Sequence, residues 1–154
     1  MHAFPPTIIL RHQKERLKKC SLRGLENRSD MQFFQYPWKK TQPNLENYVV
    51  LALDAPELSK EDVDKGIFLI DSTWRYTEKM LRSLQGPTTL RSLPSVPTAY
   101  PRHQIVDQGL ASVEALYLAY LIFKRDPEGL LDHYHWKEEF LANVKAAFPL
   151  ANAF

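Results

Sequence analysis

The chain has 154 residues, 44% of them hydrophobic and 25% charged, and a formal net charge of +2. This length suits a single domain, residues 1–154, with a substantial core. The one cysteine excludes an internal disulfide and a multi-cysteine zinc site, which is typical of a reducing cytoplasm. The sequence shows neither a signal-peptide pattern nor the run of about 20 apolar residues that a membrane span needs. We therefore expect a cytoplasmic protein that does not enter a membrane.

Charges are unevenly distributed along the chain. Basic residues dominate residues 11–28, and acidic residues dominate residues 46–64. Such polarity within a small domain indicates a surface for a polyanion, most often RNA or DNA. A solvated charged loop without a partner is the alternative interpretation. The basic side chains of the segment are Arg11, Lys14, Arg16, Lys18, Lys19, Arg23 and Arg28.

Hydrophobic patterns predict an α/β fold in which a mostly parallel sheet is flanked by helices. Strands are expected at residues 7–10, 31–36, 48–53 and 66–70. Ser59 and Asp62 resemble a capping pair, which indicates a short helix at residues 59–64. Further helices are expected at 74–84, at 112–124 and, after the start signal Asp126-Pro127, at 127–148. The prolines at positions 87, 94, 97 and 101 predict extended loops between these positions, with room for a short strand near 96–99.

The strand at residues 66–70 ends in a turn that is the best candidate for a functional site. Its apolar residues run without alternation into Asp71, as expected of a central strand covered on both faces. Asp71, Ser72 and Thr73 are good N-cap residues for a helix that begins at Trp74. In open α/β sheets, ligands bind at such turns because the free N–H groups of the helix point toward them. The alternative is that Asp71 only caps the helix and Trp74 only fills the core.

Several familiar chemistries lack their sequence markers. The chain contains no GxGxxG, GxxxxGK[ST], GxSxG or HExxH motif, which argues against dinucleotide-binding, P-loop, hydrolase and zincin proteins. His135 and Glu139 lie four residues apart in a predicted helix, but no third metal ligand accompanies them at a fixed geometry. We therefore expect no metal.

Four short motifs follow one another along the chain. They are Asp71-Ser72-Thr73-Trp74 with Arg75 and Lys79-Met80, then Arg91-Ser92-Leu93-Pro94, Thr98-Ala99-Tyr100-Pro101-Arg102 and Leu110-Ala111-Ser112-Val113-Glu114-Ala115. Their order and spacing resemble those of the SAM-dependent aminocarboxypropyltransferases of RNA. This superfamily comprises DTW-domain enzymes that modify tRNA and a related family that modifies small-subunit rRNA.

The resemblance implies a SPOUT-like fold, in which the C-terminal part of the chain forms a trefoil knot, here at about residues 91–124. It also implies that SAM lies in the knot, held largely by backbone groups, and that the protein is a monomer that binds RNA. The implied SAM-binding residues are Ser21, Leu53, Trp74, Leu93, Thr98, Ala111 and Ser112. The basic segment and the matched motifs together supply the expected RNA-binding residues, which are Arg11, Lys14, Arg16, Lys18, Lys19, Arg23, Arg75 and Arg102.

The implied reaction transfers the 3-amino-3-carboxypropyl group of SAM to a uridine-type base in tRNA or rRNA. Trp74 is expected to cover the sulfonium with an aromatic face, and Ser112 to donate to the carboxylate of the transferred group. Asp71, the second catalytic candidate beside Trp74, would bind the amino group or assist removal of the base proton. The alternatives are a non-catalytic RNA-binding or ribosome-assembly protein of the same fold and a SPOUT-type RNA methyltransferase.

Overall fold

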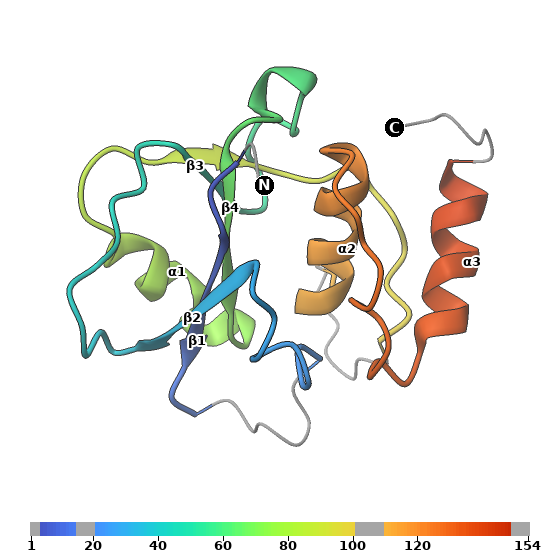
Figure 1. Ribbon diagram of the computed structural model, residues 1–154, viewed down its shortest axis with the longest axis horizontal. Coiled ribbons are helices and arrows are strands. Elements are labelled where there is room, and N and C mark those ends of the chain that lie inside the picture. Colours follow the sequence, from blue (N-terminus) through green and yellow to red (C-terminus); the bar gives the residue numbers. More distant parts are fainter. Residues whose placement is uncertain (1–3, 15–20, 101–109, 149–154) are drawn as a thin grey trace.

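A five-stranded parallel sheet forms the middle layer of the protein (Figure 1). The structure is a computed structural model, and it describes residues 4–14, 21–100 and 110–148. The strands lie in the order β2-β1-β4-β3-β5. Their bounds are Thr7–His12 for β1, Met31–Tyr36 for β2, Tyr48–Leu51 for β3, Gly66–Asp71 for β4 and Thr89–Arg91 for β5. The helices are the short 3-10 helix η1 (Lys60–Asp62), α1 (Trp74–Arg82), α2 (Ser112–Ile122) and α3 (Lys137–Ala147).

Helices cover both faces of the sheet. On one face, α1 contributes Met80 to a buried cluster with Leu10 and Phe68. On the other face, α2 lies between the sheet and α3, over a larger cluster that includes Ile9 and Leu69 (Figure 1). Every residue of β4 is buried, which explains why its apolar sequence does not alternate. Among the described residues, no helix is long and apolar enough to cross a membrane.

Most of the predicted strands are confirmed, with small changes at their ends. The strand at 31–36 has the predicted bounds, β4 and β1 extend to Asp71 and His12, and β3 ends at Leu51. The predicted helix at 59–64 is only the 3-10 helix η1, although Ser59 and Asp62 do form the capping box. The sheet also contains β5, which the sequence did not predict, whereas residues 96–99 form no strand. Three residues that pair only with β3 leave no hydrophobic pattern from which to predict a strand.

The predicted C-terminal helix at 127–148 is wrong in its first half. The helix α3 begins only at Lys137, and the residues before it form a series of turns. In these turns the Leu130 N–H donates to the Pro127 carbonyl at 3.1 Å, a bond across three residues rather than four. Gly129 has a φ of +86°, which a right-handed helix does not accommodate.

The prediction of a SPOUT-like fold with a C-terminal trefoil knot is contradicted. The described elements form an open parallel sheet with three α-helices, and no knot is found in the part of the chain that the structure describes. The features that suggested a knot have a simpler origin. The helix α2 is apolar nearly all round because it is covered by the sheet on one side and by α3 on the other (Figure 1). Pro94 and Pro97 lie in the extended segment that crosses from β5, at the sheet edge, toward α2.

Candidate functional site at the carboxyl edge of the sheet

The connections that follow β1 and β4 leave these neighbouring strands in opposite directions. The chain passes from β1 to β2 at one edge of the sheet, and from β4 through α1 to β5 at the other edge. In open parallel sheets, ligands bind outside the carboxyl ends of the strands at such a switch point. Arg11 and Asp71 are register partners there. Asp71, predicted from the sequence, therefore lies where the topology favours a ligand.

The Asp71 carboxylate is held by groups from two other segments. Ser112, the first residue of α2, donates its hydroxyl to Oδ1 at 2.8 Å, and Arg11 donates its Nε to Oδ2 at 3.1 Å. Arg11 also bonds Glu26 through Nη1 at 3.2 Å. These described bonds join Asp71 to β1 and α2. Thr73 occupies the N-cap of α1 and makes no side-chain capping bond.

The Arg11 side chain lies inside this cluster rather than on the surface. Its side chain is 12% exposed, and its guanidinium lies over the Phe33 ring at 4.8 Å. Burial alone would raise the pKa of Glu26. Backbone N–H donors at Glu26 and Gly24, together with the Arg11 charge, hold that pKa below its ordinary value. Arg11 thus links two carboxylates, which is a different role from the predicted contact with RNA phosphate.

The N-terminus of α2 is capped by a residue from another part of the chain. Ala111 occupies the N-cap position and has no side-chain oxygen to accept a hydrogen bond. Instead, the Ser21 hydroxyl, in the β1–β2 connection, accepts from the Val113 N–H at 3.1 Å. Because a free helix N-terminus leaves several N–H groups unsatisfied, this contact fixes the start of α2 against the sheet. It also brings the predicted residues Ser21, Ala111, Ser112 and Asp71 together.

A buried carboxylate, Glu114, organises the neighbouring loops. It is 0% exposed and accepts four described hydrogen bonds. The donors are the Thr98 hydroxyl at 2.5 Å, the Ala99 N–H at 2.8 Å, the Ala111 N–H at 2.8 Å and the Tyr134 hydroxyl at 2.8 Å. Thr98, a predicted SAM contact, therefore reaches the start of α2 through Glu114. Such a network specifies one arrangement of its segments because each unpaired buried group would be costly.

The other predicted SAM contacts lie at different positions around the carboxyl edge. Leu53 follows β3 and is 69% exposed, beside Asp54, whose φ of 58° is unusual for a residue other than glycine. Leu93 follows β5 and packs, partly buried, against the core under α2. Trp74 is the first residue of α1, and its side chain lies outside what the structure describes.

The predicted RNA-binding residues are only partly described. Lys14, Arg23 and Arg75 are exposed. Arg16, Lys18, Lys19 and Arg102 lie outside the described residues. The side-chain amine of Lys14 lies over the Tyr76 ring, 5.6 Å from the ring centroid. The backbone N–H of Lys14 donates to Nδ1 of His12. Burial and the charges of Lys14 and Lys79 lower the pKa of His12, which stacks on Tyr76.

Three functional features were missed by sequence reasoning: the inward position of Arg11, its partner Glu26, and the network around Glu114. A signal for the last was present, because Glu114 is the only charged residue in the otherwise apolar sequence from Ser112 to Ile122. A lone carboxylate on a buried helix predicts hydrogen-bonded partners. No comparable signal marked Arg11 or Glu26, which belong to a segment that contains many other charged residues.

The possible metal ligands His135 and Glu139 do not form a site in the structure. His135 is exposed and lies edge-on against the Trp136 ring. Within the described ranges, no group of three or more His, Cys, Asp or Glu side chains is arranged to hold a metal ion.

The fold is that of a solved SAM-dependent transferase. The structure of the SAM-dependent rRNA:acp-transferase Tsr3 from Vulcanisaeta distributa matches this chain with a TM-score of 0.69. The match covers 94% of this chain and 80% of that chain at 21% sequence identity, a level at which the likeness establishes the fold. Neither a family model nor a curated protein sequence matches the chain.

Proposed function

We propose that the chain is a SAM-dependent transferase that attaches a 3-amino-3-carboxypropyl group to a uridine-type base in RNA. The observation that carries the proposal is the meeting of Asp71, Ser112 and Ser21 at the switch point of a fold shared with Tsr3. Asp71 and Ser112 also belong to motifs that resemble those of RNA aminocarboxypropyltransferases. Since the solved relative is described as an rRNA enzyme, rRNA is the first target to test, and tRNA is the second.

The charges at this site suit the amino-acid end of SAM, which carries an ammonium and a carboxylate. Asp71 supplies a carboxylate, whose oxygens together can accept about four hydrogen bonds. Beside it, α2 supplies the positive end of a helix of 11 residues. Because the two opposite charges stand side by side, the site is complementary to a zwitterion. When bound, SAM would supply the transferred carbon on an activated sulfonium, with methylthioadenosine as the leaving group and the base N–H proton released to solvent.

In this proposal Asp71 holds the ammonium group, while Ser112 and Arg11 fix the direction of its oxygens. The described bonds from Arg11 and Ser112 hold the two Asp71 oxygens in fixed directions, which suits a residue that positions the substrate. Most of the rate acceleration would then come from positioning the reacting atoms. The RNA would be held by the exposed basic side chains that follow β1 and begin α1, such as Lys14, Arg23 and Arg75.

The deciding experiment follows two labels from SAM into RNA. Purified protein is incubated with RNA from cells that lack this gene, so that the target base is unmodified. One reaction contains SAM with carbon-14 in the carboxyl group, and a parallel reaction contains label in the methyl group. We expect carboxyl label, and no methyl label, in the RNA. Fragment analysis of the labelled RNA then distinguishes rRNA from tRNA.

Each of the other results would indicate a different activity. Methyl label without carboxyl label would mean a methyltransferase and would contradict the proposal. RNA that takes up neither label, although it binds the protein, would support the non-catalytic RNA-binding alternative.

A further inference from the structure

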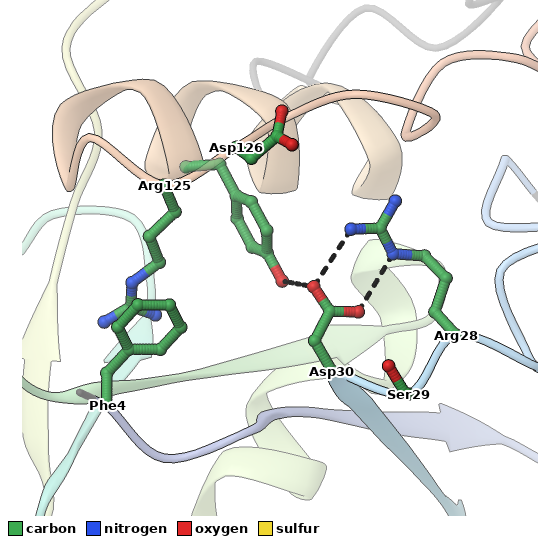
Figure 2. A pocket seen from close by; sticks show the side chains of 7 residues that line it. Phe4, Arg28, Ser29, Asp30, Arg125 and Asp126 are labelled. Atoms are coloured by element: carbon green, nitrogen blue, oxygen red, sulfur yellow. Dashed lines mark hydrogen bonds and ion pairs between the residues drawn. The ribbon is translucent and has the colours of Figure 1, made fainter. Parts of the chain in front are cut away.

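A second site lies at the opposite edge of the sheet from Asp71. A cavity of about 340 Å³ opens next to the amino ends of β1 and β2. Figure 2 shows Arg125 and Phe4 on one side of it, and Asp30 and Arg28 on the other. Tyr120 and Asp126, from the end of α2 and the turn that follows, also line it. None of these residues belongs to the site proposed for the transfer reaction.

The Arg125 side chain is a buried cation with few acceptors. The residue is 5% exposed, and its Nη2 donates to the carbonyls of Val63, at 2.9 Å, and Lys65. Its Nε and Nη1 are buried and have no hydrogen-bond partner among the described residues. Buried polar groups are almost always hydrogen-bonded, so an unpaired one calls for a water or an ion. Three N–H bonds of one guanidinium lack an acceptor, since Nε carries one and Nη1 two.

The acceptors nearest the cavity are already used by other groups. Asp30 accepts two bonds from Arg28, each at 2.9 Å, and a third from the Tyr120 hydroxyl at 3.2 Å. Arg28 in turn donates to the Glu128 carbonyl at 2.8 Å. Within the described chain, no carboxylate forms an ion pair with Arg125. Burial lowers the pKa of Arg125 to about 10, as expected of a cation that has left water without a counter-ion.

Two aromatic rings lie against the Arg125 guanidinium. Phe4 lies over it at 3.7 Å (Figure 2) and Phe123 at 4.9 Å, both measured to the ring centroid. Guanidinium N–H bonds lie in the plane of the group, so stacking on its faces does not compete with an acceptor at its edge. Phe4 is half-buried, and because Nε and Nη1 are buried, a ligand in the cavity would reach them only if the side chains around the guanidinium, Phe4 among them, moved aside.

We propose that this cavity binds a small oxyanion, a phosphate or carboxylate group, through the Nε and Nη1 of Arg125. An anion there would supply the acceptors and the counter-charge that the described chain lacks. The carboxylates of Asp30 and Asp126 line the same cavity and repel any anion in it. Because this repulsion grows with the charge of the ligand, a small anion of low charge is favoured over an RNA backbone.

The test compares thermal unfolding in sodium phosphate and in sodium chloride at equal ionic strength. We expect a rise in melting temperature of about 5–10 °C when phosphate exceeds its dissociation constant by about 100-fold. The variant Arg125→Met should lose this rise. The matched control is Arg82→Met, which removes the same charge from an exposed side chain of α1 that is paired only with Glu78 among the described residues. A phosphate effect that is equal in all three proteins, or absent from the wild type, would overturn the proposal.

A second measurement needs no folded variant. In nitrogen-15-labelled wild-type protein, titration with phosphate should shift the Nε–H resonance of the buried arginine, and acetate tested in the same way shows whether carboxylates also bind. An unchanged resonance with both anions would contradict the site. A short single-stranded RNA that displaces phosphate from Arg125 would instead identify an RNA phosphate as the occupant and overturn the assignment to a small anion.

Discussion

The two ends of α2 are attached to the sheet by the same kind of polar group. At each end, a hydroxyl donates to an aspartate that is ion-paired with an arginine. These groups are Ser112, Asp71 and Arg11 at the N-terminal end, and Tyr120, Asp30 and Arg28 at the other end. The comparison shows that residue types alone do not identify a ligand site, because the same combination of a hydroxyl, an aspartate and an arginine is found at both ends of α2.

Position distinguishes the two clusters. Arg28 and Asp30 are two residues apart, so their ion pair is local, whereas Arg11 and Asp71 are 60 residues apart and join two central strands. The Asp71 cluster lies at the carboxyl edge of the sheet, next to the positive end of α2. The Asp30 cluster lies at the amino edge, near the negative end of the helix. Only the first therefore combines a switch point with a helix N-terminus.

The largest effect expected concerns the support of the N-terminal end of α2. Glu114→Ala should lower the free energy of unfolding by about 3–4 kcal/mol, because several buried donors lose their acceptor at about 1–3 kcal/mol each. Urea denaturation measures this change. Glu128→Ala, at an exposed position of the following turn, is the control and should change stability by less than about 0.5 kcal/mol. A near-neutral Glu114→Ala would mean that the network does not organise these loops.

Exchanging each aspartate for asparagine separates the two clusters by function. If Asp71 holds the substrate ammonium as proposed, Asp71→Asn should reduce kcat/KM for carboxyl-label transfer by about 100-fold, since the charge that pairs with the ammonium is lost. Asp30→Asn should leave transfer unchanged and lower stability instead. The measurements are the label transfer and the melting temperature of both variants. Full transfer by Asp71→Asn would show that Asp71 does not belong to the site. An equal loss of transfer in both variants would show that the two clusters do not differ in function.

The alkaline limit of stability should depend on the amino-edge cluster. Burial raises the pKa of Tyr120 from 10.0 to about 12. The folded state therefore favours the neutral phenol, and the stability that this contributes is complete below pH 10 and is lost as the pH rises toward 12. Tyr120→Phe removes the bonds to Thr7 and Asp30 and should cost about 1–2 kcal/mol near pH 8.

The advantage of the wild type over Tyr120→Phe should disappear between pH 10 and 12, as measured by urea denaturation at several pH values. A difference in stability that stays constant to pH 12 would show that Tyr120 keeps an ordinary pKa.

Much of the fold could be predicted from the sequence because burial leaves a direct pattern. The unbroken apolar run of β4 and the apolar sequence of α2 both predicted elements that the structure confirms. β5 could not be predicted, since an edge strand of three residues is formed by its pairing with β3 rather than by its own composition. The knot was inferred by resemblance, and the layered position of α2 accounts for the same apolar sequence without it.

The candidate site was predictable in its residues but not in their partners. Asp71 and Ser112 stood out as a strand end and a helix start, and the structure joins them at 2.8 Å. Arg11 was predicted to contact RNA because it belongs to a basic segment, yet strand pairing places it beside Asp71. The direction of a side chain at a strand end depends on register across 60 residues, which no local pattern contains.

The smallest effect expected tests the role of Arg11 as a positioning residue. Arg11→Lys keeps the charge but removes the fork that joins Asp71 to Glu26, since a single ammonium cannot match both contacts. Stability should fall by about 1 kcal/mol, and kcat/KM for transfer by about 5–10-fold, with no change in the salt dependence of RNA binding. Arg28→Lys is the matched control, because it disturbs the equivalent pair at the amino edge and should leave transfer unchanged. The contrary result would be a flatter salt dependence of RNA binding together with normal transfer at saturating RNA. Arg11 would then be a contact to RNA phosphate rather than a residue that positions Asp71.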